Sequence, residues 1–282
     1  MHKLTYENSN GGKVTLGAMP PFVLKTFSGI NDISVDIQRQ KAPFQDGSTQ
    51  LDSLLEEREI PVQFAILTNS YSDLLNKRKL IGSVFNPKLE GKLIYEHGDF
   101  TREIRCWVDS GPSYPAGDDR GYTHQTVSVD LLALDPFWTS GDLESDPAFT
   151  SLFQFPFEGA FEMGLQQETR ILLNEGDVPT PLIVEFNGPA LNPQITKTST
   201  GEFIKVNREL QEGEKLVVDT TRGSLSVMVD DGSAMQNVFN WIDLDSTFFY
   251  LDIGENEIDY SADSDISGAI VDMYFRNQYI GV

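Results

Sequence analysis

Short runs of alternating apolar and polar residues, separated by turn residues, fill most of this sequence. A side-chain period of two is that of a β-strand with one buried face. Residues 33–37 read Ile-Ser-Val-Asp-Ile, and residues 182–186 and 215–219 are short β-prone runs in the second half. The sequence therefore predicts a mainly β fold.

One segment has helical spacing instead. Residues 71–85 place Leu74, Ile81 and Phe85 on one stripe, and Ser70 is a favourable N-cap residue. Asn86-Pro87 ends the segment. We expect this helix to pack its apolar stripe on a sheet; the alternative is that it also contacts a neighbouring subunit.

Other strands of the first half lie between turn signals such as residues 45–48. Pro61 indicates an edge strand or a strand start for residues 60–67. The turn-rich residues 110–121 are expected to form a long loop and an interaction surface. The remaining strands are predicted at residues 14–16, 22–27, 91–96, 100–108 and 126–134.

The second half continues as short strands with glycine-containing turns between them. Residues 203–206, 224–229 and 270–275 are further examples. Short strands at this spacing favour a β-sandwich or a jelly roll.

Charge and length divide the chain into two parts. The 282 residues suit two domains, and the net charge of −22 is concentrated in the second half. Residues 1–140 carry a net charge of −4, and residues 141–282 carry −18. With residues 139–148 read as a linker, we predict domains at 1–138 and 139–282. This acidity disfavours direct binding of DNA.

Several kinds of chemistry are disfavoured. No apolar run reaches the length of a membrane span and no secretory leader is apparent, so membrane insertion is not expected. The single cysteine, Cys106, lies in an alternating run and is expected to be buried. Three separated histidines, His2, His97 and His124, do not suggest a metal site. No cofactor is expected.

Acidic and aromatic residues leave alternatives open. Close carboxylate pairs occur at Asp118/Asp119, Asp230/Asp231, Asp243/Asp245 and Asp263/Asp265. Solvated turns are the expected explanation, with a glycosidase pair or, at Asp230/Asp231 or Asp263/Asp265, a calcium site as alternatives.

Core packing is expected for the aromatic residues near Trp241, with carbohydrate contact as the alternative. The phenylalanine face is expected to cover the core or to meet another subunit; it consists of Phe153, Phe155, Phe157 and Phe161.

Several short motifs occur in a characteristic order in both halves. They are Asp135-Pro136-Phe137-Trp138, Gly176-Asp177, Thr200-Gly201, Gly213-Glu214 and the pair Gly254 and Asn256. In this order the chain resembles the distal tail (Dit) protein family of siphophages. The motifs are turn residues between buried strands, so they indicate a fold and not a catalytic site.

The resemblance implies a structural role in the virion. It implies an N-terminal, ring-forming β-sandwich or split barrel with one helix and a C-terminal, galectin-like jelly-roll sandwich. The implied assembly is a homo-hexameric ring, with stacked rings as a variant, at the distal end of the tail. Such a ring joins the tail tube protein to the tail-associated fibre or lysin protein, and to a receptor-binding protein in some phages. DNA passes through its channel, and assembly takes place in the host cytoplasm.

Two other classes of function compete with this interpretation. A carbohydrate-binding module that attaches the virion to the host wall would depend on Trp241. A wall-degrading enzyme would depend on one of the carboxylate pairs. We favour the structural hub, and not an enzyme, because the family motifs span both halves while neither half contains a catalytic constellation.

Overall fold

The computed structural model describes residues 2–98, 100–141, 143–146, 168–263 and 270–282. The chain forms two compact units. The first unit contains Met1–Gly141 together with Tyr279–Val282, and the second contains Asp142–Gln278. The division between these units lies three residues after the predicted one, and the last four residues belong with the first unit. The domain limits 1–138 and 139–282 stay a prediction.

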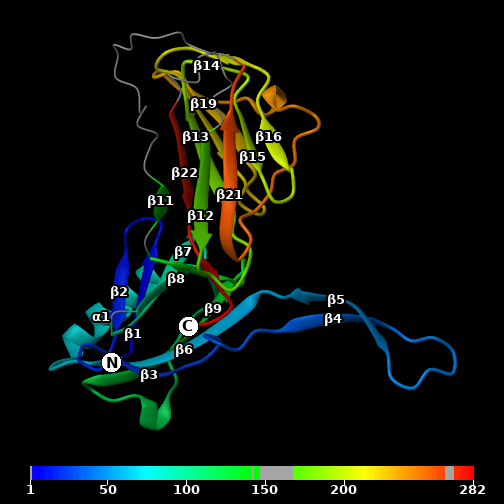
Figure 1. The fold of residues 1–282 in the computed structure, drawn as a ribbon. Coiled ribbons are helices and arrows are strands. Elements are labelled where there is room, and N and C mark those ends of the chain that lie inside the picture. The colour runs from blue at the N-terminus through cyan, green and yellow to red at the C-terminus, as the bar shows by residue number, and fades with distance from the viewer. Residues whose placement is uncertain (1, 99, 142, 147–167, 264–269) are drawn as a thin grey trace. The chain divides into compact units, whose positions relative to one another are not determined.

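The first unit is a strongly curved sheet with one helix. The strand order is β2-β1-β7-β8-β9-β6-β3, and a bridge between Gly17 and Val23 brings the two ends of this order together. This closure gives a barrel-like fold (Figure 1). Its elements are β1 (Lys3–Asn8), β2 (Lys13–Leu16), β3 (Phe22–Phe27), β4 (Val35–Gln40), β5 (Thr49–Leu55), β6 (Arg58–Leu67), α1 (Tyr71–Val84), β7 (Gly91–His97), β8 (Phe100–Ser113), a 3-10 turn (Gly117–Asp119), β9 (His124–Ala133) and β10 (Trp138–Ser140).

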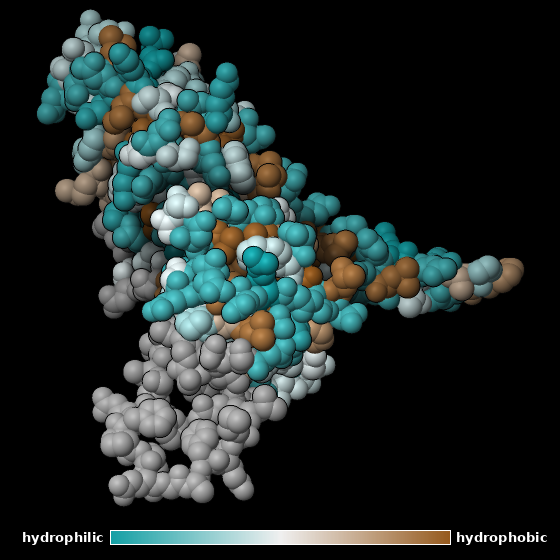
Figure 2. Space-filling model, turned by 90° about the horizontal axis from the view of Figure 1, so that it is seen from above, coloured by the Kyte–Doolittle hydropathy of each residue, from teal (hydrophilic) through white to brown (hydrophobic). Residues whose placement is uncertain are grey.

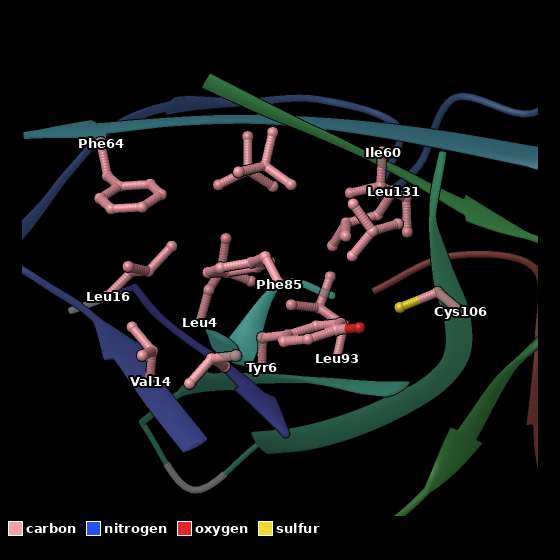
Figure 3. Packing of buried hydrophobic residues seen from close by; sticks show 14 of the residues in the cluster. Leu4, Tyr6, Val14, Leu16, Ile60, Phe64, Phe85, Leu93, Cys106 and Leu131 are labelled. Carbon is pink, nitrogen blue, oxygen red and sulfur yellow. The ribbon is translucent and has the colours of Figure 1, made fainter. Parts of the chain in front are cut away.

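The helix α1 packs against the core of this unit, as predicted. The Ser70 side chain accepts a hydrogen bond from the Asp73 amide and so caps the N-terminus. Ile81 is fully buried, and Phe85, just after the helix, stacks on Tyr6 with ring centroids 4.6 Å apart. Figure 3 shows these rings among side chains from β1, β2, β6, β7 and β9.

Three local predictions for the first unit are corrected by the structure. The strand at residues 33–37 was expected to be half-buried, but β4 is exposed along its whole length. Pro61 lies inside β6, which pairs with β9 and β3 on its two sides, and so does not mark an edge strand. The pairing with β3 reaches only to Val62, so the proline removes no hydrogen bond from that ladder. The expected loop at 110–121 begins later, because β8 continues to Ser113.

The second unit is a two-sheet sandwich with its own core. One sheet has the order β11-β22-β13-β18-β19-β20, and the other has the order β12-β21-β15-β16. The elements are β11 (Glu144–Asp146), β12 (Glu168–Asn174), β13 (Leu182–Asn187), β14 (Ala190–Leu191), β15 (Gln194–Lys197), β16 (Phe203–Lys205), β17 (Glu209–Leu210), β18 (Lys215–Asp219), β19 (Ser226–Asp230), β20 (Met235–Asn237), a 3-10 turn (Phe239–Trp241), β21 (Gly254–Ser261) and β22 (Ile270–Phe275). The last strand, β23 (Gln278–Tyr279), lies where the chain returns to the first unit, and it pairs with β10.

Strand alternation explains the core of the sandwich. Leu182, Val184 and Phe186 of β13 are buried, while the residues between them are partly exposed. The predicted fold class, mainly β with one helix and a sandwich in the second half, is confirmed. The linker expected at 139–148 is corrected, because its residues contribute to β10 and β11.

Arg58 lies at the start of β6 and is almost completely buried, with 1% of its surface exposed. Its guanidinium donates hydrogen bonds to the carbonyl oxygens of Pro136 (2.8 Å), Gly29 (2.8 Å) and Ile30 (3.0 Å) and to that of Ile280. Gly29 adopts φ +78°, and a Cβ there would lie 1.9 Å from the Glu59 carbonyl oxygen. Arg58 therefore joins three segments that are far apart in the sequence.

Replacing this guanidinium should destabilise the first unit. Arg58→Met keeps much of the volume but leaves the carbonyl groups that Arg58 binds, two of them in buried contacts, without their charged donor. We expect the free energy of unfolding to fall by about 3–5 kcal/mol. Urea unfolding followed by tryptophan fluorescence measures this, with Trp107 and Trp138 reporting on the first unit and Trp241 on the second. Glu59→Gln, at the exposed neighbouring position, should stay within about 0.5 kcal/mol of the parent chain; equal stability of both variants would contradict the role of Arg58.

Candidate assembly surface

A two-stranded hairpin, β4 and β5 with the connecting residues 41–48, extends from the sheet of the first unit. We call this hairpin the arm. Among the described residues, β4 and β5 pair only with each other. Figure 1 shows the arm running outward from β6, and Figure 2 shows apolar residues along its length. The arm therefore presents both faces and both edges to the surroundings.

The pairing register gives the arm two different faces. Val35 lies opposite Leu55 and Ile37 opposite Ser53, whereas Asp36 and Gln38 lie on the other side of β4. The first face is therefore the more apolar. Val35 is 43% exposed and Ile37 55% exposed.

Two further apolar residues add to this surface. The register shifts between Gln38 and Arg39, so Leu51 is an extra residue in β5, and it is 62% exposed. Phe44 lies in the connecting segment, is fully exposed and has φ +61°. Large apolar side chains and free strand edges are the two features by which a hairpin binds another protein surface.

The Asp135–Trp138 motif serves the interior of the first unit. Trp138 is completely buried, and its indole nitrogen donates to the Ile30 carbonyl at 3.1 Å. Pro136 supplies a carbonyl to Arg58, and the Asp135 carboxylate accepts from the Phe137 amide at 3.4 Å. This motif therefore shapes the chain where it leaves β9.

The motifs of the second unit form turns and a close backbone approach. Gly176 lies against Gln278, since a Cβ at Gly176 would be 2.4 Å from the Gln278 carbonyl oxygen, and the Asp177 amide donates to that oxygen at 2.8 Å. Asn256 is buried and bonds to Asp252 through both side-chain atoms. The remaining motif residues lie in turns at Thr200-Gly201 and Gly213-Glu214, and Gly254, with φ +90°, is the first residue of β21.

The histidines are closer together than the sequence suggested. His2 and His97 stack with ring centroids 4.4 Å apart, so the expectation that all three lie apart is wrong. His2 Nδ1 also lies 2.7 Å from the Tyr95 hydroxyl. Within the described ranges, no group of three or more His, Cys, Asp or Glu side chains is arranged to hold a metal ion.

In two of the carboxylate pairs, Asp230/Asp231 and Asp243/Asp245, carboxylates cap turns, whereas Asp119 accepts from Thr126 and Asp263 from Asn192. Hydrogen bonds from the Ser233 hydroxyl and amide and from the Ala234 amide lower the pKa of Asp231 to about 2. The Asn207 amide nitrogen and then the Asp245 amide lower the pKa of Asp243. The side chain of Asp118 and all of Asp265 lie outside the described residues.

Trp241 is partly buried and packs against the core of the second unit. The Arg208 guanidinium lies over its ring, 5.0 Å from the centroid. Nearby, Phe239 stacks on Phe248 at 5.7 Å. Carbohydrate contact by Trp241 stays a prediction. The predicted phenylalanine face at residues 153–161 lies outside the described residues.

Two family matches together cover most of the chain. Residues 9–132 match the phage tail protein RIFT-related domain, and residues 175–279 match the siphovirus-type tail component, C-terminal domain. The chain belongs to the siphophage distal tail protein family. The expected resemblance is thus confirmed, and the protein is a phage tail component.

Solved structures of phage proteins share the fold. The Dit protein of phage SPP1, described as a paradigm of the hub adsorption apparatus in phages that infect Gram-positive bacteria, aligns with a TM-score of 0.69 at 12% identity, covering 98% of each chain. Chains of the phage P2 baseplate, in its activated conformation with calcium and with strontium, align over 100% of both chains at 9% identity with TM-scores of 0.58 and 0.56. No curated protein matches the chain in sequence.

Among the residues that the structure covers, none lies in a helix with the length and apolar character needed to cross a membrane.

Cys106, as predicted, is a core residue of β8. Its side chain is fully buried, and its sulfur points into the core cluster (Figure 3). Burial raises the pKa of the Cys106 thiol to about 12.

This thiol should therefore be inert in the folded protein. Burial keeps the thiol protonated at ordinary pH, and it also shields the sulfur from reagents in solution. We expect labelling by a disulfide reagent at pH 8 to be at least about 100-fold slower than in the urea-unfolded chain. Complete labelling of the native protein within minutes would contradict this assignment.

Proposed function

We propose that this protein is the distal tail hub of a siphophage, a homo-hexameric ring whose neighbouring copies are joined by the arm. The family and the fold support a tail hub. The observation that best supports a ring is the exposed apolar face of the arm.

The first strand of the arm has the alternating sequence of a strand with one buried face, but that face is exposed in the single chain. Residues 33–37 alternate as a strand with one covered face does, yet Val35 and Ile37 are exposed in the single chain. An isolated two-stranded hairpin is marginally stable in water, so a long, ordered arm needs a covering surface. A second copy of the chain provides this cover.

The geometry of such a contact leads to ring closure. An arm that contacts a different surface on the next copy makes a heterologous interface, and repetition of this contact closes a ring if the rotation fits. The SPP1 relative is described as a hub adsorption apparatus, which agrees with a ring at the tail end.

The charge distribution supports a channel for DNA in the ring-forming unit. Residues 1–140 have a net charge of −4, so this unit lacks the dense basic surface that would retain phosphate. The hub would join the tail tube protein to the tail-tip fibre or lysin protein, with a receptor-binding protein as a further partner. Assembly would take place in the host cytoplasm, and the chain would act without catalysing a reaction.

The arm hypothesis predicts a change in mass on substitution. Ile37→Asp places a charge on the apolar face, and burying that charge is unfavourable at every interface of the ring. We expect the parent chain to have the mass of a hexamer by light scattering and the variant the mass of a monomer at the same concentration.

Gln38→Asp is the matched control, because it adds the same charge to the other face of the same strand. It should keep the hexameric mass. A parent chain that stays monomeric, both alone and with its tail partners, would refute the ring; a hexamer that tolerates Ile37→Asp would refute the role of the arm.

A further inference from the structure

The chain crosses between the two units twice. It leaves the first unit after Gly141 and returns to it at Tyr279. We call residues 279–282 the strap. Gln278 and Tyr279 form β23, which pairs with β10, the strand that precedes the outward crossing. The two crossings therefore start from neighbouring strands.

The chain is held within the second unit until Gln278. The Asp177 amide donates to the Gln278 carbonyl, and the Glu175 amide donates to the Asn277 side chain at 3.1 Å. The Thr180 hydroxyl donates to the Arg276 carbonyl at 2.5 Å. These bonds fix the segment immediately before the strap.

From Tyr279 onward, different bonds fix the chain in the first unit. The Arg102 guanidinium lies 3.6 Å from the centroid of the Tyr279 ring, and this ring also packs against the core cluster. Arg58 donates to the Ile280 carbonyl, and the Val282 amide donates to the Asn31 side chain at 2.9 Å. Asn31 also lies against Gly281, where a Cβ would be 2.6 Å from its Oδ1.

We infer that the strap is a second, independent attachment of the sandwich unit, able to hold that unit when the other crossing is cut. A charged donor to a backbone carbonyl and a cation over an aromatic ring are both strong contacts for so short a segment. The second unit is thus an insertion in the first, fastened at both ends. This inference does not depend on the proposed ring.

Cutting the first crossing tests the strap directly. A recognition sequence for a site-specific protease is inserted between residues 142 and 143 of the full chain, so that β11 stays on the C-terminal fragment with its partner β22. Of the contacts described above, only those of the strap then join the C-terminal fragment to the N-terminal one. We expect the two fragments to elute together in size-exclusion chromatography.

Two variants separate the strap from other contacts between the fragments. Deletion of residues 279–282 should release the C-terminal fragment after cleavage. Tyr279→Ala, which removes the ring beneath Arg102, should raise the dissociation constant about tenfold. Leu244→Ala, at a fully exposed position in the second unit, should change nothing.

A synthetic peptide of residues 276–282 covers the case in which the deletion variant fails to fold. Added in excess to the cleaved parent protein, it should displace the C-terminal fragment, and the same peptide with Tyr279→Ala should do so less well. Separation of the parent fragments without any peptide, or their persistent association after the deletion, would overturn the inference.

Discussion

The buried guanidinium of Arg58 is the contact on which the arrangement of the first unit depends. Burial lowers the pKa of Arg58, and nearby Asp32 raises it, but arginine stays charged at neutral pH. A buried cation must be fully hydrogen-bonded, and its bonds reach the segment before the arm, the Asp-Pro-Phe-Trp motif and the strap. The root of the arm and the return crossing are thereby fixed at one place, beside the motif that precedes the outward crossing.

The first unit therefore consists of a closed, well-packed core and an exposed arm. The core of the first unit is closed by α1 and by the barrel-like sheet, and Cys106 inside it is buried. The arm, in contrast, exposes Val35, Ile37 and Leu51. A rigid base with an exposed apolar extension is suited to joining copies of one chain, because the base holds the extension in a single direction.

Local signals in the sequence predicted local structure well. Ser70 and the spacing of Leu74 and Ile81 predicted α1, and β-prone runs predicted about half of the strands, with β1, β12, β15 and β21 among those not predicted. Strand β5 was missed because the extra residue Leu51 interrupts its alternation. The role of Arg58 was missed because an arginine bound to backbone carbonyls leaves no pattern in the sequence. The burial of residues 33–37 was predicted wrongly for a single chain. Alternation indicates that one face of a strand is buried, but it does not show whether that face packs on its own chain or on another molecule.

The central claim is that a second copy covers the apolar face of the arm. An electron-microscopy reconstruction of the purified assembly tests it most directly. The account predicts six copies around a channel, with Ile37 of each copy packed against its neighbour. A ring in which the arms point into solvent, with the copies joined by other surfaces, would contradict it.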